Sequence, residues 1–454
     1  MSKLVLVKDI KKYNKTNKIM RDCKVQEVQK FSAFSGGGGN AFYQKRKEIE
    51  TFDLFDPDGT ADSNKIRVAL PFSYFYHNCS DVQTIQHDQK KIEMNFNGSL
   101  LPRQKLIRDD IFSILNRTNS ILLCLHTGFG KTIFALYIAS KIKMKTIVLC
   151  HRKIIIDQWV NAVKKYLPDV TVEVLNPKKK PTSDIVIGNV LTVPKCNENN
   201  PYRSTFSEYG TLLLDEVHTV CTEQFSKALF HIYPQWLIGL SATPHRSDGM
   251  DKLIQLYVGP EGVYKDMWRI FNVYKLNTGF VPEIKRNNDG SIEWNSALSS
   301  QANSKSRNEM IVKLVQYFKS RKILVLVKRT DHANALKEML FQAGDDVDTF
   351  MESDKSANFN CRVLIATYSK GGVGFDHPGL DMLIGAADVE ENFMQYLGRI
   401  FRKDDTAPIY VDLIDDNPIM KKHSTTRIKI CTSVGGVIRK FNECFPNKEL
   451  ALAL

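Results

Sequence analysis

The amino-acid sequence predicts an α/β protein with two tandem domains, each a parallel sheet covered by helices, preceded by an accessory domain. From about residue 98 onward, short apolar runs alternate with longer segments of helical apolar spacing, which is typical of parallel sheets. A polar stretch near residues 275–305 interrupts this alternation, and a second alternation follows. A chain of 454 residues is also long for one hydrophobic core. We therefore expect more than one domain.

The domain limits follow from these changes of pattern. Residues 1–97 are the expected accessory domain, in which a glycine run at 36–39 predicts a flexible loop. The first α/β domain is expected at 98–275, with candidate strands at 121–125, 146–149, 185–187, 212–214 and 237–240. Residues 276–304 are the expected linker, because Asn287-Asn288-Asp289-Gly290 is a strong turn signal. A second α/β domain at 305–430 and a carboxyl-terminal tail at 431–454 complete the chain.

The composition indicates the kind of partner and compartment. A formal net charge of +13 favours a polyanionic partner, since net charge steers association. The nine cysteines are scattered without the short spacings of a zinc or redox site, which predicts free thiols in a reducing compartment. No segment has the features of a signal peptide or approaches the ~18 apolar residues of a membrane span. We expect a soluble intracellular protein with no membrane partner.

A glycine loop follows the candidate strand 121–125 and precedes a candidate helix at 132–142. Its sequence is Thr127-Gly128-Phe129-Gly130-Lys131-Thr132. Glycines let backbone N–H groups approach phosphates, and a helix amino terminus adds the positive end of its dipole. Lys131 would reach the β and γ phosphates of ATP, and the Thr132 hydroxyl would ligate Mg²⁺. The match to the full pattern is partial, because Leu125 occupies the position of its first glycine.

Two carboxylates follow another candidate strand at the point where it ends. Asp215 and Glu216 come directly after residues 212–214. Asp215 would hold Mg²⁺, and Glu216 would orient and deprotonate the water that attacks the γ phosphate. An Asp-Glu pair after a strand is common on protein surfaces. Beside a phosphate loop in the same domain, we favour the catalytic interpretation.

Two arginines lie in the second predicted α/β domain. Arg399 and Arg402 belong to the segment Gln395-Tyr-Leu-Gly-Arg-Ile-Phe-Arg402, and their spacing predicts that both project from one face of a helix. A guanidinium is permanently charged and can meet the negative charge that builds on the γ phosphate. We expect the two arginines to complete the site when the two domains close. Taken alone, the two arginines would be better explained by a solvated helix face.

Taken in order, these segments resemble the motifs of superfamily 2 helicases over roughly residues 98–415. The matching segments are His126–Thr132 for motif I, Asp215–His218 for motif II, Ser241–Thr243 for motif III, Ile365–Asp376 for motif V and Gln395–Arg402 for motif VI. The resemblance implies tandem RecA-like domains, ATP and Mg²⁺ as cofactors, and ATP-driven movement on nucleic acid. Within the superfamily, Ser241–Asp251 is most similar to the XPB and UvsW group and to the poxvirus A18-like helicases of large DNA viruses.

The resemblance also implies roles for single residues. Nucleotide contacts are implied for Gln104, Thr127, Gly128, Gly130, Gly374 and Asp376. Nucleic-acid contact or coupling between sites is implied for Arg152, His218, Ser241, Thr243, Arg246, Thr367 and Gln395. One departure concerns adenine recognition. The family has an arginine three residues before the glutamine, and Leu101 stands there in this chain.

The function implied by the resemblance is that of a DNA helicase or duplex translocase. Its track would be single-stranded or duplex DNA, in viral transcription, replication or repair. If the protein is viral, we expect it in the cytoplasm or in the virion, and otherwise in the nucleus. The alternative among enzymes is an RNA helicase or transcript-release ATPase, with RNA or a transcription complex as partner. A third hypothesis is a non-hydrolysing nucleic-acid scaffold clamped by ATP. The presence of Glu216 and both arginines argues against that scaffold.

Overall fold

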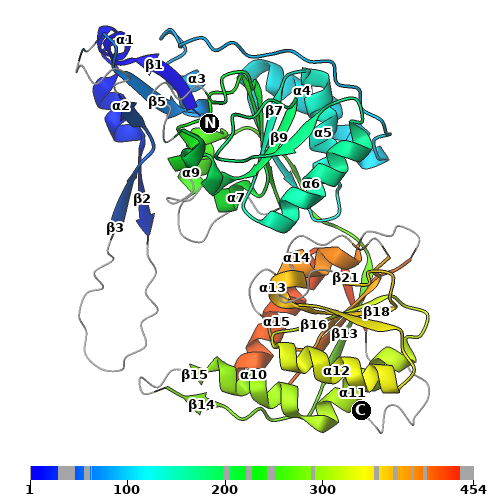
Figure 1. Cartoon of the computed structure of the whole chain (residues 1–454). Helices are drawn as coiled ribbons and strands as arrows, with labels where there is room; N and C mark the ends of the chain where they lie inside the picture. Colours follow the sequence, from blue (N-terminus) through cyan, green and yellow to red (C-terminus); the bar gives the residue numbers. More distant parts are fainter. Residues whose placement is uncertain are drawn as a thin grey trace, which may run out of the picture. The chain divides into compact units, whose positions relative to one another are not determined.

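The computed structural model describes residues 2–28, 46–55, 62, 64–197, 205–220, 227–242, 251–287, 292–351, 357–371, 377, 379–389, 393–401 and 406–439. The chain divides into two compact units, Met1–Lys265 and Asp266–Leu454. Each unit contains a large sheet whose described strands pair in parallel, with helices against it (Figure 1). The predicted α/β fold class is therefore confirmed.

The large sheet of the first unit has seven described strands in the order β12-β6-β11-β10-β7-β9-β8. Their bounds are β6 Ser120–Leu125, β7 Thr146–Cys150, β8 Val172–Val174, β9 Ile185–Asn189, β10 Thr211–Leu214, β11 Trp236–Ser241 and β12 Gly262–Lys265. Every residue of β6, β7 and β10 is buried. Strands covered on both faces have nearly continuous apolar sequences, which explains why these strands could be predicted from the sequence.

Helices cover both faces of this sheet. On one side lie α4 Pro102–Thr118, α5 Lys131–Ile142 and α6 Lys153–Tyr166 (Figure 1). The other side holds α3 Phe72–Asn78, α7 Val217–Val220 and α9 Asp251–Tyr257, with two short 3-10 turns at Val190–Thr192 and Pro194–Asn197. On that side, Leu122, Leu149 and Leu212 of the sheet share one hydrophobic core with Val217 and Leu253.

The amino-terminal region packs into the same unit. It contains an antiparallel sheet β1-β5-β4, formed by Ser2–Leu6, Arg67–Pro71 and Asp53–Phe55, and an antiparallel pair, β2 Lys24–Val28 with β3 Arg46–Glu50. Two helices, α1 Val7–Lys12 and α2 Thr16–Asp22, follow β1. Leu4, Val68 and Phe72 belong to the hydrophobic core that contains Leu122 and Leu149. The residues expected to form a separate accessory domain thus share their core with the first α/β domain.

The large sheet of the second unit has seven described strands in the order β17-β18-β16-β19-β20-β13-β21. Their bounds are β13 Phe271–Asn277, β16 Ile323–Val327, β17 Val347–Phe350, β18 Val363–Thr367, β19 Met382–Gly385, β20 Ile409–Ile414 and β21 Gly436–Arg439. Helices α11 Lys305–Tyr317 and α12 Thr330–Gln342 place Ile311, Leu314 and Leu336 in the core on one face. The other described elements are β14 Lys285–Arg286, β15 Ile292–Glu293, α10 Trp294–Asn303, α13 Tyr368–Gly371, α14 Phe393–Leu397 and α15 Pro418–Ser433.

Strand β13 lies across the domain boundary expected from the sequence. Residues up to 275 were assigned to the first α/β domain, but β13 pairs in parallel with β20 and β21 of the second sheet. Helix α10 occupies much of the expected linker, and α15 and β21 extend beyond residue 430. The division between Lys265 and Asp266 arises because buried Phe271, Val273 and Leu276 complete the second sheet. Apolar alternation predicts a strand, but it does not tell which sheet the strand joins.

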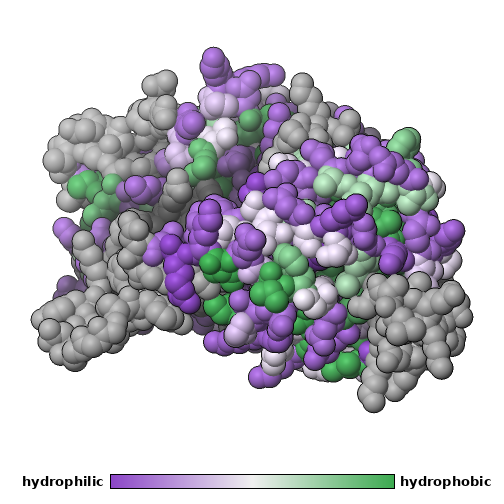
Figure 2. Space-filling view, turned by 90° about the horizontal axis from the view of Figure 1, so that it is seen from below, coloured by the Kyte–Doolittle hydropathy of each residue, from purple (hydrophilic) through white to green (hydrophobic). Residues whose placement is uncertain are grey.

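The surface seen in Figure 2 is mainly hydrophilic. Hydrophobic side chains form small patches separated by hydrophilic ones, which is normal for a protein surface. Among the described helices, none has the length and apolar character needed to cross a bilayer.

Candidate active site

The predicted phosphate loop connects the end of β6 to the start of α5. Gly128 and Gly130 have φ angles of 84° and 87°, a region that glycine adopts without steric cost. Gly130 caps α5, and the first N–H groups of a helix are free to bind an anion. Lys131 donates a hydrogen bond from Nζ to the carbonyl oxygen of Leu125 at 3.1 Å. The ammonium group is therefore held beside the end of β6, at the phosphate loop.

Gln104 of α4 braces this loop. Its Nε2 donates to the carbonyl oxygens of Phe129, at 3.1 Å, and Gly130, at 3.3 Å, and its Oε1 accepts from the backbone N–H of Leu101 at 2.9 Å. The side chain is 1% exposed. A Cβ atom at Gly130 would lie 2.7 Å from Nε2, so a side chain at this position would displace the Gln104 amide from the loop. The residue expected to contact adenine thus packs against the phosphate loop itself.

Sequence reasoning did not identify Arg103 as part of this region. Its Nη2 donates to the carbonyl oxygen of Gly128 at 2.9 Å, and its guanidinium lies 5.7 Å from the centre of the Phe129 ring. The available signal was its place in the Leu-Pro-Arg-Gln segment, next to Gln104. Thr127 and Thr132 are half-buried, in the loop and in the first turn of α5.

The acidic pair follows β10, as predicted. Asp215 is 8% exposed, and the indole Nε1 of Trp159 in α6 donates to its Oδ2 at 2.8 Å. Burial, followed by the charge of Glu216, raises the pKa of Asp215 to about 6, whereas the hydrogen bond from Trp159 and the charge of Lys131 act in the opposite direction. Trp159 is itself buried. Its contact with Asp215 was not foreseen.

Glu216 connects the acidic pair to the end of β11. Its φ angle is 51°, in the left-handed region that costs a non-glycine residue roughly 1–2 kcal/mol. Its Oε2 lies 3.5 Å from Nδ1 of His218, and the same Nδ1 lies 2.9 Å from Oγ of Ser241. The segments resembling motifs II and III are therefore in direct contact, which is the arrangement a relay through His218 requires.

Arg152 lies at the same edge of the sheet. It is exposed at the start of α6, directly after β7. Burial, followed by the charges of Arg152 and His218, lowers the pKa of His151 to about 4. The carboxyl ends of β6, β7, β10 and β11 thus bring the predicted residues together, as expected at one edge of a parallel sheet. Thr243 and Arg246, also predicted here, lie outside the described residues.

In the second unit, the segments resembling motifs V and VI are in contact. Thr367 ends β18 and is 3% exposed, and its Oγ1 lies 3.1 Å from Oγ of Ser369. Arg399 is 8% exposed and donates from Nε to the carbonyl oxygen of Gly371 at 3.2 Å. Gln395 is half-buried in α14. The structure therefore anchors Arg399 on the segment that follows β18.

One geometric prediction for this segment is wrong. Arg399 and Arg402 were expected on one face of a continuous helix, but α14 ends at Leu397 and a 3-10 turn follows at Gly398–Ile400. Gly398 explains the change, because glycine is a poor helix former and short 3-10 turns are common at helix ends. Arg402, together with Gly374 and Asp376, lies outside the described residues.

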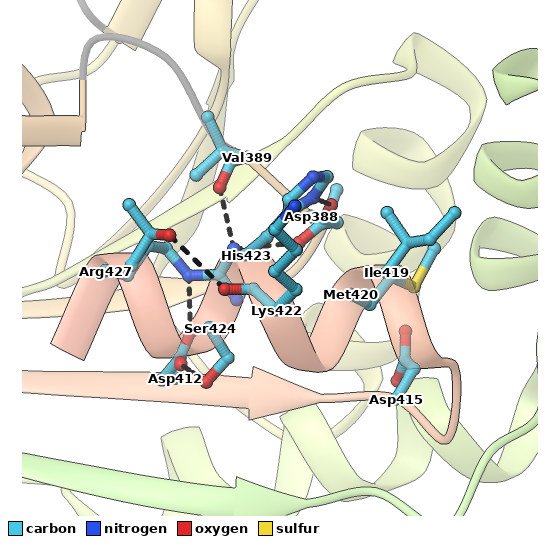
Figure 3. A network of polar contacts seen from close by, with 12 residues as sticks. Asp388, Val389, Asp412, Asp415, Ile419, Met420, Lys422, His423, Ser424 and Arg427 are labelled. Atoms are coloured by element: carbon cyan, nitrogen blue, oxygen red, sulfur yellow. Dashed lines mark hydrogen bonds and ion pairs between the residues drawn. The ribbon is translucent and has the colours of Figure 1, made fainter. Parts of the chain in front are cut away.

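A buried polar network holds α15 against this part of the second unit (Figure 3). Arg427 donates from Nε to Asp412 of β20 at 2.8 Å, and from Nη1 to Asp388 at 2.8 Å and to the carbonyl oxygen of Val389 at 2.7 Å. Ser424 donates to the second carboxylate oxygen of Asp412 at 2.6 Å. These bonds fix the segment that precedes α14 and Arg399.

Comparisons with known proteins agree with this architecture. A family model described as "Type III restriction enzyme, res subunit" matches residues 82–246, a range that includes the phosphate loop and the acidic pair. A putative helicase, 161L, of Invertebrate iridescent virus 6 is 33% identical over 378 residues, which cover 77% of this chain and 84% of that protein. The matched share exceeds the length of either unit, so the similarity extends into both.

More distant relatives differ in the nucleic acid that their names mention. A putative ATP-dependent RNA helicase, L396, of Acanthamoeba polyphaga mimivirus is 26% identical, covering 86% of this chain and 78% of that protein. A DNA 3′-5′ translocase, XPB2, of Sulfurisphaera tokodaii is 22% identical, covering 64% and 77%. Among solved structures, S. cerevisiae Dbp5 bound to RNA and ADP BeF3 has a TM-score of 0.52 at 14% identity, covering 78% of this chain and 98% of that chain.

The structural likeness confirms that both units have the fold of helicase RecA-like domains. The similarity to viral helicases extends over most of both proteins. The chain therefore belongs to the superfamily 2 helicases, nucleic-acid-dependent ATPases, and groups with the helicases of large DNA viruses.

Proposed function

We propose that this helicase moves on DNA, as a duplex translocase or an unwinding enzyme, in viral transcription, replication or repair. One observation carries the catalytic part of the proposal. Lys131, Asp215 and Glu216 gather at one edge of the first sheet, closely enough that the charges of the other two act on the pKa of Asp215. The choice of DNA is supported by similarity to a protein named as a DNA translocase. Similarity to a protein named as an RNA helicase supports the alternative.

The first unit would hold ATP through its phosphate loop. The N–H groups around Gly128 and Gly130 and the ammonium of Lys131 would neutralise the phosphates. Thr132 and Asp215 would hold Mg²⁺, which when bound stabilises the charge of the transferring phosphoryl group. These residues fit the ion, because a hydroxyl and a carboxylate are oxygen ligands. A buried carboxylate with a raised pKa also gains stability from a cation beside it.

Glu216 would accept a proton from the attacking water. Its backbone lies in the left-handed region, and such strain is often found at functional sites. His218 and Ser241 would transmit the state of the nucleotide from the acidic pair to the end of β11. Arg152, Thr243, Arg246, Thr367 and Gln395 would contact nucleic acid or couple it to this change.

The second unit would contribute charge and nucleotide contacts during turnover. Arg399 and Arg402 would neutralise negative charge on the γ phosphate in the transition state. Gly374 and Asp376 would contact the nucleotide. Gln104 would position the phosphate loop and the adenine together, since its amide already bonds the loop carbonyls.

The experiment that tests the track is ATP turnover measured in parallel with single-stranded DNA, duplex DNA and RNA of one sequence. We expect DNA to stimulate turnover at lower concentration than RNA. Stimulation by RNA alone would establish the alternative, an RNA helicase or transcript-release ATPase. Binding of ATP without turnover on any of the three would instead establish a non-hydrolysing clamp.

A further inference from the structure

A polar cavity of about 250 Å³ lies at the other edge of the first sheet. Its lining includes Lys3 of β1, His87 and Gln89 before α4, and Asn119 and Gln235, which directly precede β6 and β11. The phosphate loop and Asp215 follow the carboxyl ends of strands, whereas this cavity adjoins their amino ends. Six residues of β6 separate the two edges, a distance of about 20 Å at ~3.3 Å per residue. The cavity is therefore separate from the candidate active site.

Lys3 brings an ammonium group into this cavity. Its Nζ donates to the carbonyl oxygen of Pro234 at 2.8 Å and lies 5.0 Å and 5.2 Å from the ring centres of Phe72 and Tyr76. Burial lowers the pKa of Lys3 to about 8. Within the described part of the chain, no carboxylate acts on the charge of Lys3 and none of the cavity residues is acidic. A cation taken out of water without a counter-ion is unfavourable, and a bound anion would relieve that cost.

His87 adds a second hydrogen-bonding group. Its ring stacks on that of Tyr233 with centres 5.0 Å apart and an angle of 6°. Its Nε2 is buried and has no hydrogen-bond partner among the described residues. Burial, followed by the charges of Lys3 and Arg67, lowers the pKa of His87 to about 4. At neutral pH the ring is therefore uncharged and offers one N–H donor.

We propose that this cavity binds a phosphate group, held by the Lys3 ammonium, the His87 ring and the side-chain amides of Asn119 and Gln235. An amide N–H donates to phosphate oxygen, and lysine is a common point charge for phosphate. The volume of about 250 Å³ is below the ~300–1,000 Å³ of pockets for drug-sized ligands. This volume is sufficient for a single phosphate group. The group belongs either to free phosphate or to the phosphorylated end of a nucleic-acid strand.

The test measures binding of inorganic phosphate to the full chain by ³¹P line broadening at constant ionic strength. Every protein carries Lys131→Ala, which weakens phosphate binding at the ATP site. We expect Lys3→Met to weaken the remaining binding at least tenfold and Lys8→Met, on the exposed side of α1, to leave it unchanged. His87→Phe keeps a ring to stack on Tyr233 and should weaken binding too. This second variant decides the matter if Lys3→Met fails to fold.

Two oligonucleotides that differ only in a 5′ phosphate distinguish the sources. If only the phosphorylated strand competes with inorganic phosphate, the ligand is a phosphorylated strand end. If neither strand competes, the ligand is free phosphate. Equal competition by both strands would contradict the proposal, because such competition would not depend on the terminal phosphate. Phosphate binding that is unchanged in both Lys3→Met and His87→Phe would overturn it. ATP turnover does not enter this readout, so failure here leaves the proposed helicase activity untouched.

Discussion

At the scale of residues, Trp159 positions the carboxylate that is proposed to hold Mg²⁺. Its indole N–H donates to Oδ2 of Asp215 at 2.8 Å inside the first unit, and such outer contacts orient metal ligands. We predict that Trp159→Phe, which keeps an aromatic ring but removes the donor, raises the Mg²⁺ concentration for half-maximal ATP turnover about 10-fold. A Mg²⁺ titration of turnover measures this shift.

The matched control for Trp159→Phe is Trp268→Phe, since Trp268 is 70% exposed. We expect that control to leave the Mg²⁺ dependence unchanged. A purely structural role for Trp159 would lower maximal turnover or stability without moving the Mg²⁺ titration, and that result would contradict the positioning role.

His332 makes the stability of the second unit sensitive to acid. The side chain is 2% exposed and Nε2 lies 2.9 Å from Oδ1 of Asn308. Burial, followed by the charge of Arg307, lowers the pKa of His332 to about 3. The pKa of His332 in the folded state lies below the unfolded value near 6.5, so protonation favours the unfolded state. The contribution of neutral His332 to the free energy of unfolding is therefore fully present above pH 6.5 and is lost as the pH falls toward 3. At ~1.4 kcal/mol per pH unit, about 2 kcal/mol is lost by pH 5.

We predict that His332→Gln shows a smaller loss of unfolding free energy between pH 7 and pH 5 than the parent chain, by about 2 kcal/mol. Urea unfolding at the two pH values measures this difference. His77→Gln, at an exposed position of α3, is the matched control substitution. Equal pH dependence in the parent and in His332→Gln would show that His332 is not the titrating group.

The sequence predicted the positions of some site residues but not the contacts of others. The loop around Lys131 and the acidic pair were predicted because each directly follows an apolar run, and local order along the chain determines where they lie. Trp159 and Asp215 are 56 positions apart, and their contact depends on how α6 packs on the sheet. No local pattern encodes such a contact.

At the scale of elements, the network around Arg427 anchors α15 to β20. Arg427 bonds Asp412 and Asp388, and all three side chains are buried. Removing one partner of a buried ion pair leaves an uncompensated charge and costs about 3–5 kcal/mol. We predict that Arg427→Met lowers the free energy of unfolding by this amount, as measured in urea.

The control for Arg427→Met is Arg439→Met in β21, where the arginine is exposed and its Nε donates to Oδ1 of Asn272 at 3.1 Å. That substitution should change stability by less than about 0.5 kcal/mol. A loss equally small in Arg427→Met would mean that the network contributes no stability to the second unit.

Helices and strands whose sequence pattern has one explanation were predicted well. Segments whose pattern fits more than one structure were not. The strands at β6, β7 and β10 were found because they are buried along their whole length and apolar after a first Ser or Thr residue. The segment from Gln395 onward was expected to be one helix, since its spacing allowed it, but the helix ends at Leu397. Gly398 and the bond from Arg399 to the Gly371 carbonyl favour the 3-10 turn instead.

At the scale of the whole molecule, the two-domain plan was predictable but its limits were not. Both α/β units were identified from repeated alternation along the chain. β13 was assigned to the first domain because it precedes the polar stretch, yet its hydrogen bonds are to β20 and β21. The amino-terminal region was expected to stand apart, but Leu4 and Val68 join the core of the first sheet. Sequence order locates elements, whereas long-range pairing decides which domain they join.

The central claim is that the loop around Lys131 and the acidic pair hydrolyse ATP in response to nucleic acid. The most direct measurement compares ATP turnover by the parent chain, Lys131→Ala and Glu216→Gln, with and without DNA, using Glu309→Gln in α11 as an exposed control. We predict that DNA stimulates the parent and the control. Lys131→Ala and Glu216→Gln should lose at least ~10²-fold in turnover while still binding DNA. Full turnover in Glu216→Gln, or a parent rate that no nucleic acid changes, would contradict the account.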